Sequence, residues 1–225
     1  MTVLISPPRT GEAEPGTRLS ILVLVAQDNE CTGVDLGSGA FVRASWPSGS
    51  APPGPDQAVA LRPYQVAKAV VGEDDSPPDP SRPEGVVLSG PPLPDARISP
   101  RRARRHLRPL LAPRGRPLLS FPGPTIPYWQ LAGTHPSLAL VPAEGLHVIM
   151  AEGGVLRAGF YWDGLNHLFP LVEQRAYSLV VASGRTRLSA GALARVLGHQ
   201  VSYLLLALSP PEGGHCYKTV LGLLP

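Results

Sequence analysis

Cysteine, methionine and lysine are scarce in this chain of 225 residues, which contains two of each. Cys31 and Cys216 lie far apart in the sequence, which excludes a disulfide framework and a cysteine-rich metal site. We therefore expect two free thiols. The six histidines are scattered singly, so the sequence predicts neither a metal site nor a cofactor.

Long hydrophobic runs are also missing. The longest, residues 21–26 and 204–208, have the length of a strand and fall far short of the roughly 20 apolar residues that span a membrane. The first residues contain neither the positive region nor the apolar region of a secretory signal. The sequence thus predicts no membrane span and a cytoplasmic location.

Familiar catalytic and nucleic-acid motifs are absent as well. Gly37-Ser38-Gly39 lacks the further glycines of a dinucleotide fingerprint and the Gly-Lys-Ser/Thr of a phosphate loop. The chain contains no HExxH, no paired CxxC and no GxSxG. It also has no RNA-recognition signature, GXXG clamp or zinc finger. No enzyme class is indicated, and enzymatic activity is somewhat disfavoured.

What the chain does contain is arginine, concentrated in one short block. Residues 1–96 carry 6 basic and 12 acidic side chains (−6), residues 97–116 carry 8 arginines and no acid (+8), and residues 117–225 carry 6 and 5 (+1). These sum to the net charge of +3. The scarcity of lysine and asparagine suggests a GC-rich coding sequence, so the placement of arginine is more informative than its abundance. An acidic, proline-rich stretch at 73–84 precedes the block, and we expect it to neutralise the block in part.

Several apolar and β-branched segments bounded by glycine, proline, asparagine or aspartate predict strands. Residues 19–27 and 32–46 form an expected hairpin with its turn at Asp28-Asn29, and Gly37 and Gly39 allow a bend in the return strand. Further strands are predicted within 58–71 and at 85–89. The dipeptides Gly153-Gly154 and Asp163-Gly164 predict a three-stranded meander over 146–171.

Towards the carboxyl end, residues 172–182 are a helix or a strand, and a helix capped by Ser189 ends at Gly198. A closing hairpin follows, formed by residues 201–209 and 215–223. The sequence therefore predicts an α+β fold of mainly antiparallel strands (a meander, a partly open barrel or a sandwich) with two or three short helices. We expect a single strand-rich domain over residues 1–225, with long proline-rich loops and one candidate boundary at 76–94.

The arginine block predicts an amphipathic helix. Ser99 and Pro100 are typical of a helix start, and Pro109 ends or kinks the helix. The arginines gather on one face, opposite Ala103 and Leu107. Such a face suits phosphates or an acidic protein surface, although a merely solvated face is the commoner role. The candidate binding residues are Arg101, Arg102, Arg104, Arg105, Arg108, Arg114 and Arg116.

The segment Gly213 to Lys218 has the densest set of reactive side chains. In a strand, His215 and Tyr217 lie on one face and Cys216 and Lys218 on the other. A thiolate at Cys216, favoured by Lys218 and with His167 or His199 as the base, is the weak catalytic hypothesis. His215 is a further weak candidate, although it does not face Cys216. An inert buried cysteine is the commoner interpretation.

Three functions therefore remain. The first is a non-enzymatic binding or assembly protein that presents its arginine-rich helix to nucleic acid or to an acidic protein. The second is an enzyme of unknown class that uses Cys216 and Lys218 with a histidine. The third is a structural subunit of a larger assembly, joined through proline-rich loops and exposed apolar residues.

Overall fold

The computed structural model describes residues 13–47, 61–74, 76–77, 79–131, 135–150 and 152–225. The chain divides into two compact units, Met1–Pro109 and Leu110–Pro225. Strands in the described residues are mostly antiparallel, and three short α-helices accompany them. The predicted α+β class is confirmed. The single domain expected over residues 1–225 stays a prediction.

The first unit contains a six-stranded sheet in the order β5-β3-β2-β1-β4-β6. Its neighbours are antiparallel, except that β3 and β5 are parallel. The strands are β1 (Arg18–Gln27), β2 (Glu30–Asp35), β3 (Phe41–Ser45), β4 (Gln65–Val70), β5 (Gly85–Val87) and β6 (Leu93–Arg97).

The opening hairpin forms as predicted, with Asp28 in the left-handed region (φ 47°) at its turn. The expected return strand over 32–46 is wrong in one respect, because it is split into β2 and β3. The Asp35 carboxylate causes the split: Oδ2 accepts a hydrogen bond from the backbone nitrogen of Ser38 at 2.9 Å, which closes a turn. Gly39, with φ of 73°, completes that turn.

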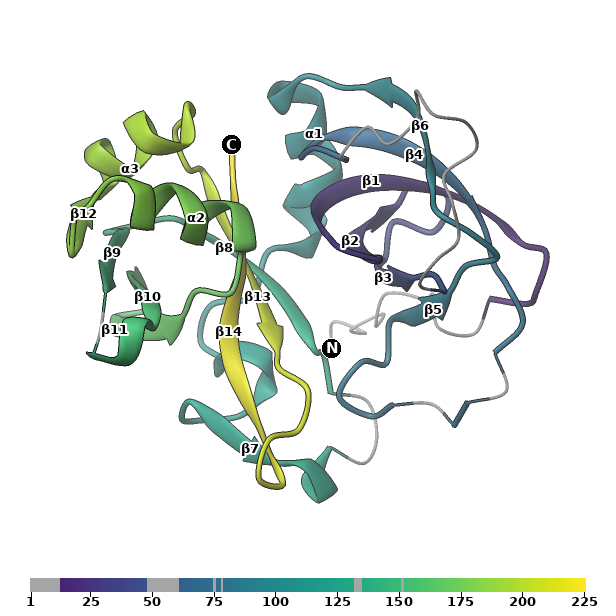
Figure 1. Ribbon diagram of the computed structural model, residues 1–225. Helices are drawn as coiled ribbons and strands as arrows, with labels where there is room; N and C mark the ends of the chain where they lie inside the picture. The colour runs from purple at the N-terminus through teal and green to yellow at the C-terminus, as the bar shows by residue number, and fades with distance from the viewer. Residues whose placement is uncertain (1–12, 48–60, 75, 78, 132–134, 151) are drawn as a thin grey trace. The chain divides into compact units, whose positions relative to one another are not determined.

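The sheet of the first unit curls into a partly open barrel. The order β3-β2-β1-β4 is a Greek key, in which three consecutive strands are followed by a fourth beside the first. β5 returns beside β3, and its end meets the end of β4 through hydrogen bonds from Gly72 N to Val87 O and from Ser89 N to Val70 O. Figure 1 shows this curvature.

The interior of the barrel is apolar. Ile21 and Val23 of β1 and Val42 and Ala44 of β3 belong to one buried cluster. Side chains alternate between the faces of a strand, so Arg43 points to the outside of the barrel. A helix, α1 (Pro100–Leu107), follows β6 and continues into the 3₁₀ turn η2 (Arg108–Leu110).

The second unit contains two four-stranded sheets, in the orders β11-β10-β9-β12 and β7-β14-β13-β8. The strands of the first sheet are β9 (His147–Met150), β10 (Leu156–Trp162), β11 (Leu165–Pro170) and β12 (Arg187–Ser189). Those of the second are β7 (Thr125–Pro127), β8 (Leu138–Pro142), β13 (Tyr203–Leu208) and β14 (His215–Leu224). The short 3₁₀ elements are η3 (Leu118–Ser120), η4 (Tyr128–Gln130) and η5 (Glu152–Gly154).

The predicted meander is confirmed as β9-β10-β11. The two-residue turn expected at Gly153-Gly154 is wrong, because Met150 pairs with Leu156 and both glycines belong to η5 in a longer connection. Asp163 and Gly164 both have positive φ (49° and 83°), as a two-residue hairpin turn requires. The ambiguous segment 172–182 contains a helix, α2 (Gln174–Ala182). The next helix, α3 (Ala190–Leu197), is capped by Ser189 and ends at Gly198 (φ 76°), as predicted. Val180 of α2 and Leu193 of α3 are buried in the core of the second unit.

Both cysteines are free, as expected, and both are buried: Cys31 lies in the core of the first unit and Cys216 in that of the second. In the described part of the chain, no helix is both long enough and apolar enough to cross a membrane.

Candidate functional site

The arginine-rich helix α1 begins where the sequence predicts. The Ser99 side chain accepts a hydrogen bond from the backbone nitrogen of Arg102 at 3.4 Å, and Pro100 occupies the first helical position. The helix ends at Leu107 and tightens into η2, which contains Pro109. Ala103 and Leu107 are the buried residues of this short helix, and the burial of Leu107 contributes roughly 1.5–3 kcal/mol.

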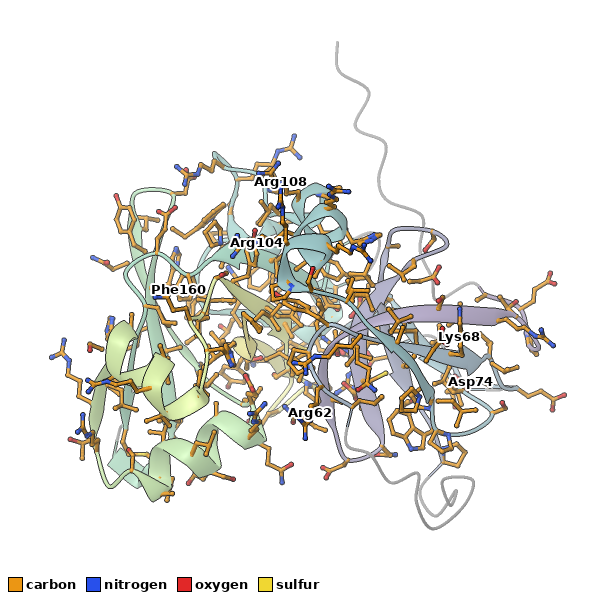
Figure 2. The ribbon with its side chains drawn as sticks, turned by 90° about the horizontal axis from the view of Figure 1, so that it is seen from above. Arg62, Lys68, Asp74, Arg104, Arg108 and Phe160 are labelled. Atoms are coloured by element: carbon orange, nitrogen blue, oxygen red, sulfur yellow. The ribbon has the colours of Figure 1, made fainter. Side chains whose placement is uncertain are left out.

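The opposite side of α1 is cationic and exposed. None of the described carboxylates lies within ion-pair distance of Arg101, Arg102, Arg105 or Arg108. Arg104 is exposed on the same helix, and Figure 2 labels it together with Arg108. Because α1 also has no acid in its first turn, nothing on the helix itself balances this charge.

Of the remaining arginines of the block, Arg97 ends β6 in the first unit, and Arg114 and Arg116 lie in the second unit. A distance of 3.3 Å separates Arg114 Nη2 from Glu144 Oε1, and the Arg114 guanidinium lies 5.4 Å from the centroid of the Trp162 ring. Arg116 is exposed. The cationic residues that the sequence groups together thus include one, Arg114, that is already engaged within its own unit.

Two carboxylates of the acidic stretch at 73–84 have partners outside α1. Glu84 is buried and pairs with Arg43, while the side chain of Asp79 accepts hydrogen bonds from Ser81. Among the described residues of the stretch, none pairs with the four arginines that lack ion-pair partners on α1.

Cys216 and Lys218 lie on one face of β14, as the strand prediction requires, but both are buried. Cys216 is 0% exposed, so no substrate reaches its sulfur in this conformation. Lys218 donates a hydrogen bond from Nζ to the carbonyl oxygen of Phe121 at 2.7 Å, and Nζ lies 4.1 Å from the centroid of the Phe121 ring. Burial lowers the pKa of Lys218 to about 8.

The two candidate histidines have different surroundings. His215 packs edge-on against Trp129, with ring centroids 5.9 Å apart, and its Nδ1 lies 3.2 Å from Gly213 O. His167 stacks on Phe160 at 5.3 Å. Burial, and then the nearby charge of Lys218, lower the pKa of His167. The charge of Lys218 therefore acts on His167. Cys216, in contrast, is buried, so neither histidine can help it to react with a substrate.

Arg43 is a candidate that the sequence does not reveal. Its side chain on β3 is 3% exposed, and its Nε lies 3.3 Å from Glu84 Oε1. Burial lowers its pKa, and the Glu84 carboxylate opposes that change. An arginine between the inward-facing Val42 and Ala44 has the pattern of a solvent-facing strand residue. It is buried here beside Glu84, and described residues between β4 and β5, among them Asp79 and Pro83, line a cavity together with Arg43.

No group of three potential metal ligands occurs among the described residues. Comparison with protein-family models, curated proteins and solved structures finds no match to this chain.

Proposed function

We propose that the protein is a non-enzymatic binding protein and that α1 binds the phosphates of a nucleic acid. The observation that carries the proposal is the row of exposed arginines on α1, four of which have no described carboxylate as a partner. Guanidinium groups bind phosphate oxygens through two parallel hydrogen bonds. Each such contact also releases counterions from the nucleic acid, which favours binding at low salt.

The barrel of the first unit supports nucleic acid over an acidic protein as the partner. Partly open five-stranded barrels with Greek-key connectivity serve as oligonucleotide-binding scaffolds, and β1 to β5 form such a barrel here, with β6 added beside β4. That likeness concerns architecture alone and adds weight without assigning a function. The proposal also places the protein in the cytoplasm, where two free thiols such as Cys31 and Cys216 are stable.

The proposal is tested by replacing Arg101, Arg102, Arg105 and Arg108 together with glutamine. Binding of a fluorescent single-stranded oligonucleotide is measured by anisotropy at several salt concentrations. Loss of four phosphate contacts should reduce the slope of log K against log salt by about 2.8, which corresponds to about fifty-fold in affinity between 50 and 200 mM salt.

A second quadruple variant provides the control. Its substitutions lie on exposed residues of the second unit and also lower the net charge from +3 to 3 − 4 = −1: Arg175→Gln, Arg185→Gln, Arg187→Gln and Arg195→Gln. We expect this variant to keep the salt slope of the parent. A parent that does not bind, or equal slopes in the two variants, contradicts the proposal. Stronger binding of poly-glutamate than of the oligonucleotide favours the acidic-protein alternative.

A further inference from the structure

Trp129 is an aromatic side chain of the second unit that its neighbours hold in place without covering it. It is 68% exposed, the largest fraction among the large apolar side chains in the part of the chain that the structure describes. An indole left in water is unfavourable, and tryptophan is enriched where a protein meets a partner. The exposure of Trp129 is therefore typical of a residue that contacts a ligand.

The surroundings of Trp129 fix the position of its ring. Trp129 belongs to η4, which follows β7. The backbone nitrogen of Tyr128 donates a hydrogen bond to Gly214 O at 2.9 Å, which ties η4 to the turn between β13 and β14 (Figure 1). The His215 ring packs against the indole, and a Cβ placed on Gly214 would lie 3.5 Å from it, so the glycine backbone also contacts the ring. The indole is thus positioned before a ligand binds, which lowers the entropic cost of binding.

Two independent features of the chain select the kind of ligand. The exposed arginines of α1, four of which lack a described carboxylate partner, favour a polyanion. The exposed indole of Trp129 favours a flat ring that can stack on it. An acidic protein surface presents carboxylates rather than flat rings, and a duplex keeps its bases stacked inside. An unpaired nucleic-acid strand presents phosphates and bases together.

We propose that Trp129 stacks on a base of an unpaired strand, so that the partner of this protein is a single-stranded nucleic acid. The inference rests on the proposed function, because the arginines of α1 supply the argument for a nucleic acid. Every base has a π face, so stacking on Trp129 tolerates any sequence. Stacking neutralises no phosphate, so Trp129 contributes to the affinity but not to its salt dependence.

The affinity for a fluorescent thymidine oligonucleotide of about twenty nucleotides, measured by anisotropy, tests the proposal. Trp129→Ala should weaken binding about five-fold or more, and it should leave the slope of log K against log salt unchanged. Trp129→Phe retains an aromatic ring and should recover most of the affinity. Leu165→Ala is the matched control, because it removes another exposed apolar side chain of the second unit, and it should bind as the parent does.

Two further measurements link the loss of affinity to stacking. The same strand annealed to its complement hides its bases, so the parent and Trp129→Ala should bind the duplex equally. Binding of the single strand should quench the tryptophan emission of the parent more than that of Trp129→Phe, because a stacked base quenches an indole and the buried Trp162 cannot stack on a ligand. Circular dichroism establishes that the variants are folded.

The outcomes separate this inference from the proposed function. If Trp129→Ala binds the single strand as tightly as the parent does, or loses affinity for the duplex to the same extent, the inference is overturned and the proposed function stands. If the quadruple variant of α1 keeps the salt slope of the parent while Trp129→Ala loses affinity, the proposed function fails and the inference stands. A parent that binds no oligonucleotide overturns both.

Discussion

Replacing Lys218 with methionine should make the second unit more stable at neutral pH. The side chain of Lys218 is 3% exposed as a residue, and its ammonium meets one carbonyl oxygen and one aromatic ring, both from Phe121. No described carboxylate lies within ion-pair distance of it. Methionine has a similar length and carries no charge, so Lys218→Met removes the cost of burying the ammonium while filling the same space.

The pKa of Lys218 gives the magnitude and the sign. Burial lowers the pKa from 10.5 to about 8, a difference that corresponds to about 3 kcal/mol. Between pH 8 and pH 10.5 the unfolded chain binds this proton and the folded chain does not. The free energy of unfolding therefore rises with pH across that interval, by up to about 3 kcal/mol. Below pH 8 both states carry the proton, and the folded state bears the full cost of burial.

At pH 7 the variant loses a hydrogen bond to Phe121 O, worth about 1 kcal/mol, and a cation–π contact of about 1 kcal/mol. The variant also removes the cost of burying the ammonium, about 3 kcal/mol, so its free energy of unfolding at pH 7 should exceed that of the parent by about 1 kcal/mol. The assay is urea unfolding followed by circular dichroism from pH 7 to pH 10.5. Lys68→Met is the matched control, because the side chain of Lys68 is 58% exposed. If Lys218→Met retains the rise of the parent protein with pH, the reasoning is refuted.

Two further predictions use the other buried titratable groups. Burial, and then the charge of Glu30, raise the pKa of Cys31 to about 12, and Cys216 is 0% exposed. We therefore expect neither thiol to react with Ellman's reagent at pH 8 until the chain is unfolded. Rapid labelling of folded protein at Cys216 would instead revive the catalytic hypothesis. Burial raises the pKa of Glu173 from 4.5 to about 7 despite a hydrogen bond from Leu223 N at 2.7 Å, so the folded state holds a proton that the unfolded state releases. The free energy of unfolding should therefore fall as pH rises from 4.5 to 7. Thermal unfolding at pH 4.5 and at pH 7 should show this dependence in the parent and not in Glu173→Gln. An unchanged dependence in the variant would contradict the assignment to Glu173.

Local chemistry made parts of the fold predictable. Asp163-Gly164 fixes a hairpin because both residues adopt positive φ, and Ser189 and Gly198 fix the two ends of α3. The start of α1 at Ser99 follows from the same kind of rule. Each of these signals lies within a few residues of the structure that it specifies, so that structure can be predicted from the sequence alone.

Features that depend on distant segments were not predictable. The pairing of β5 with β3 joins residues 85 − 43 = 42 positions apart, and the bonds of its end to β4 join residues 15 and 19 positions apart, so no short pattern encodes them. The burial of Arg43 depends on the pairing of β5 with β3, because Glu84, the ion-pair partner of Arg43, directly precedes β5. Similarly, nothing near Lys218 in the sequence indicates Phe121 as its partner. Alternation along a strand predicts the face on which a residue lies, but not whether another segment covers that face.

The charges of the first unit thus separate into two sets with different physical behaviour. Arg43 and Arg82 have carboxylate partners, Glu84 and Glu30, in partly or fully buried surroundings where salt screens weakly. The exposed arginines of α1 face solvent, where screening is strong beyond about 8–10 Å. Phosphate binding by α1 must therefore weaken steeply with salt, whereas the ion pairs of Arg43 and Arg82 should persist. Raising the salt concentration should therefore release a bound oligonucleotide while the first unit stays folded, and unfolding at the same salt concentration would contradict this separation of the charges.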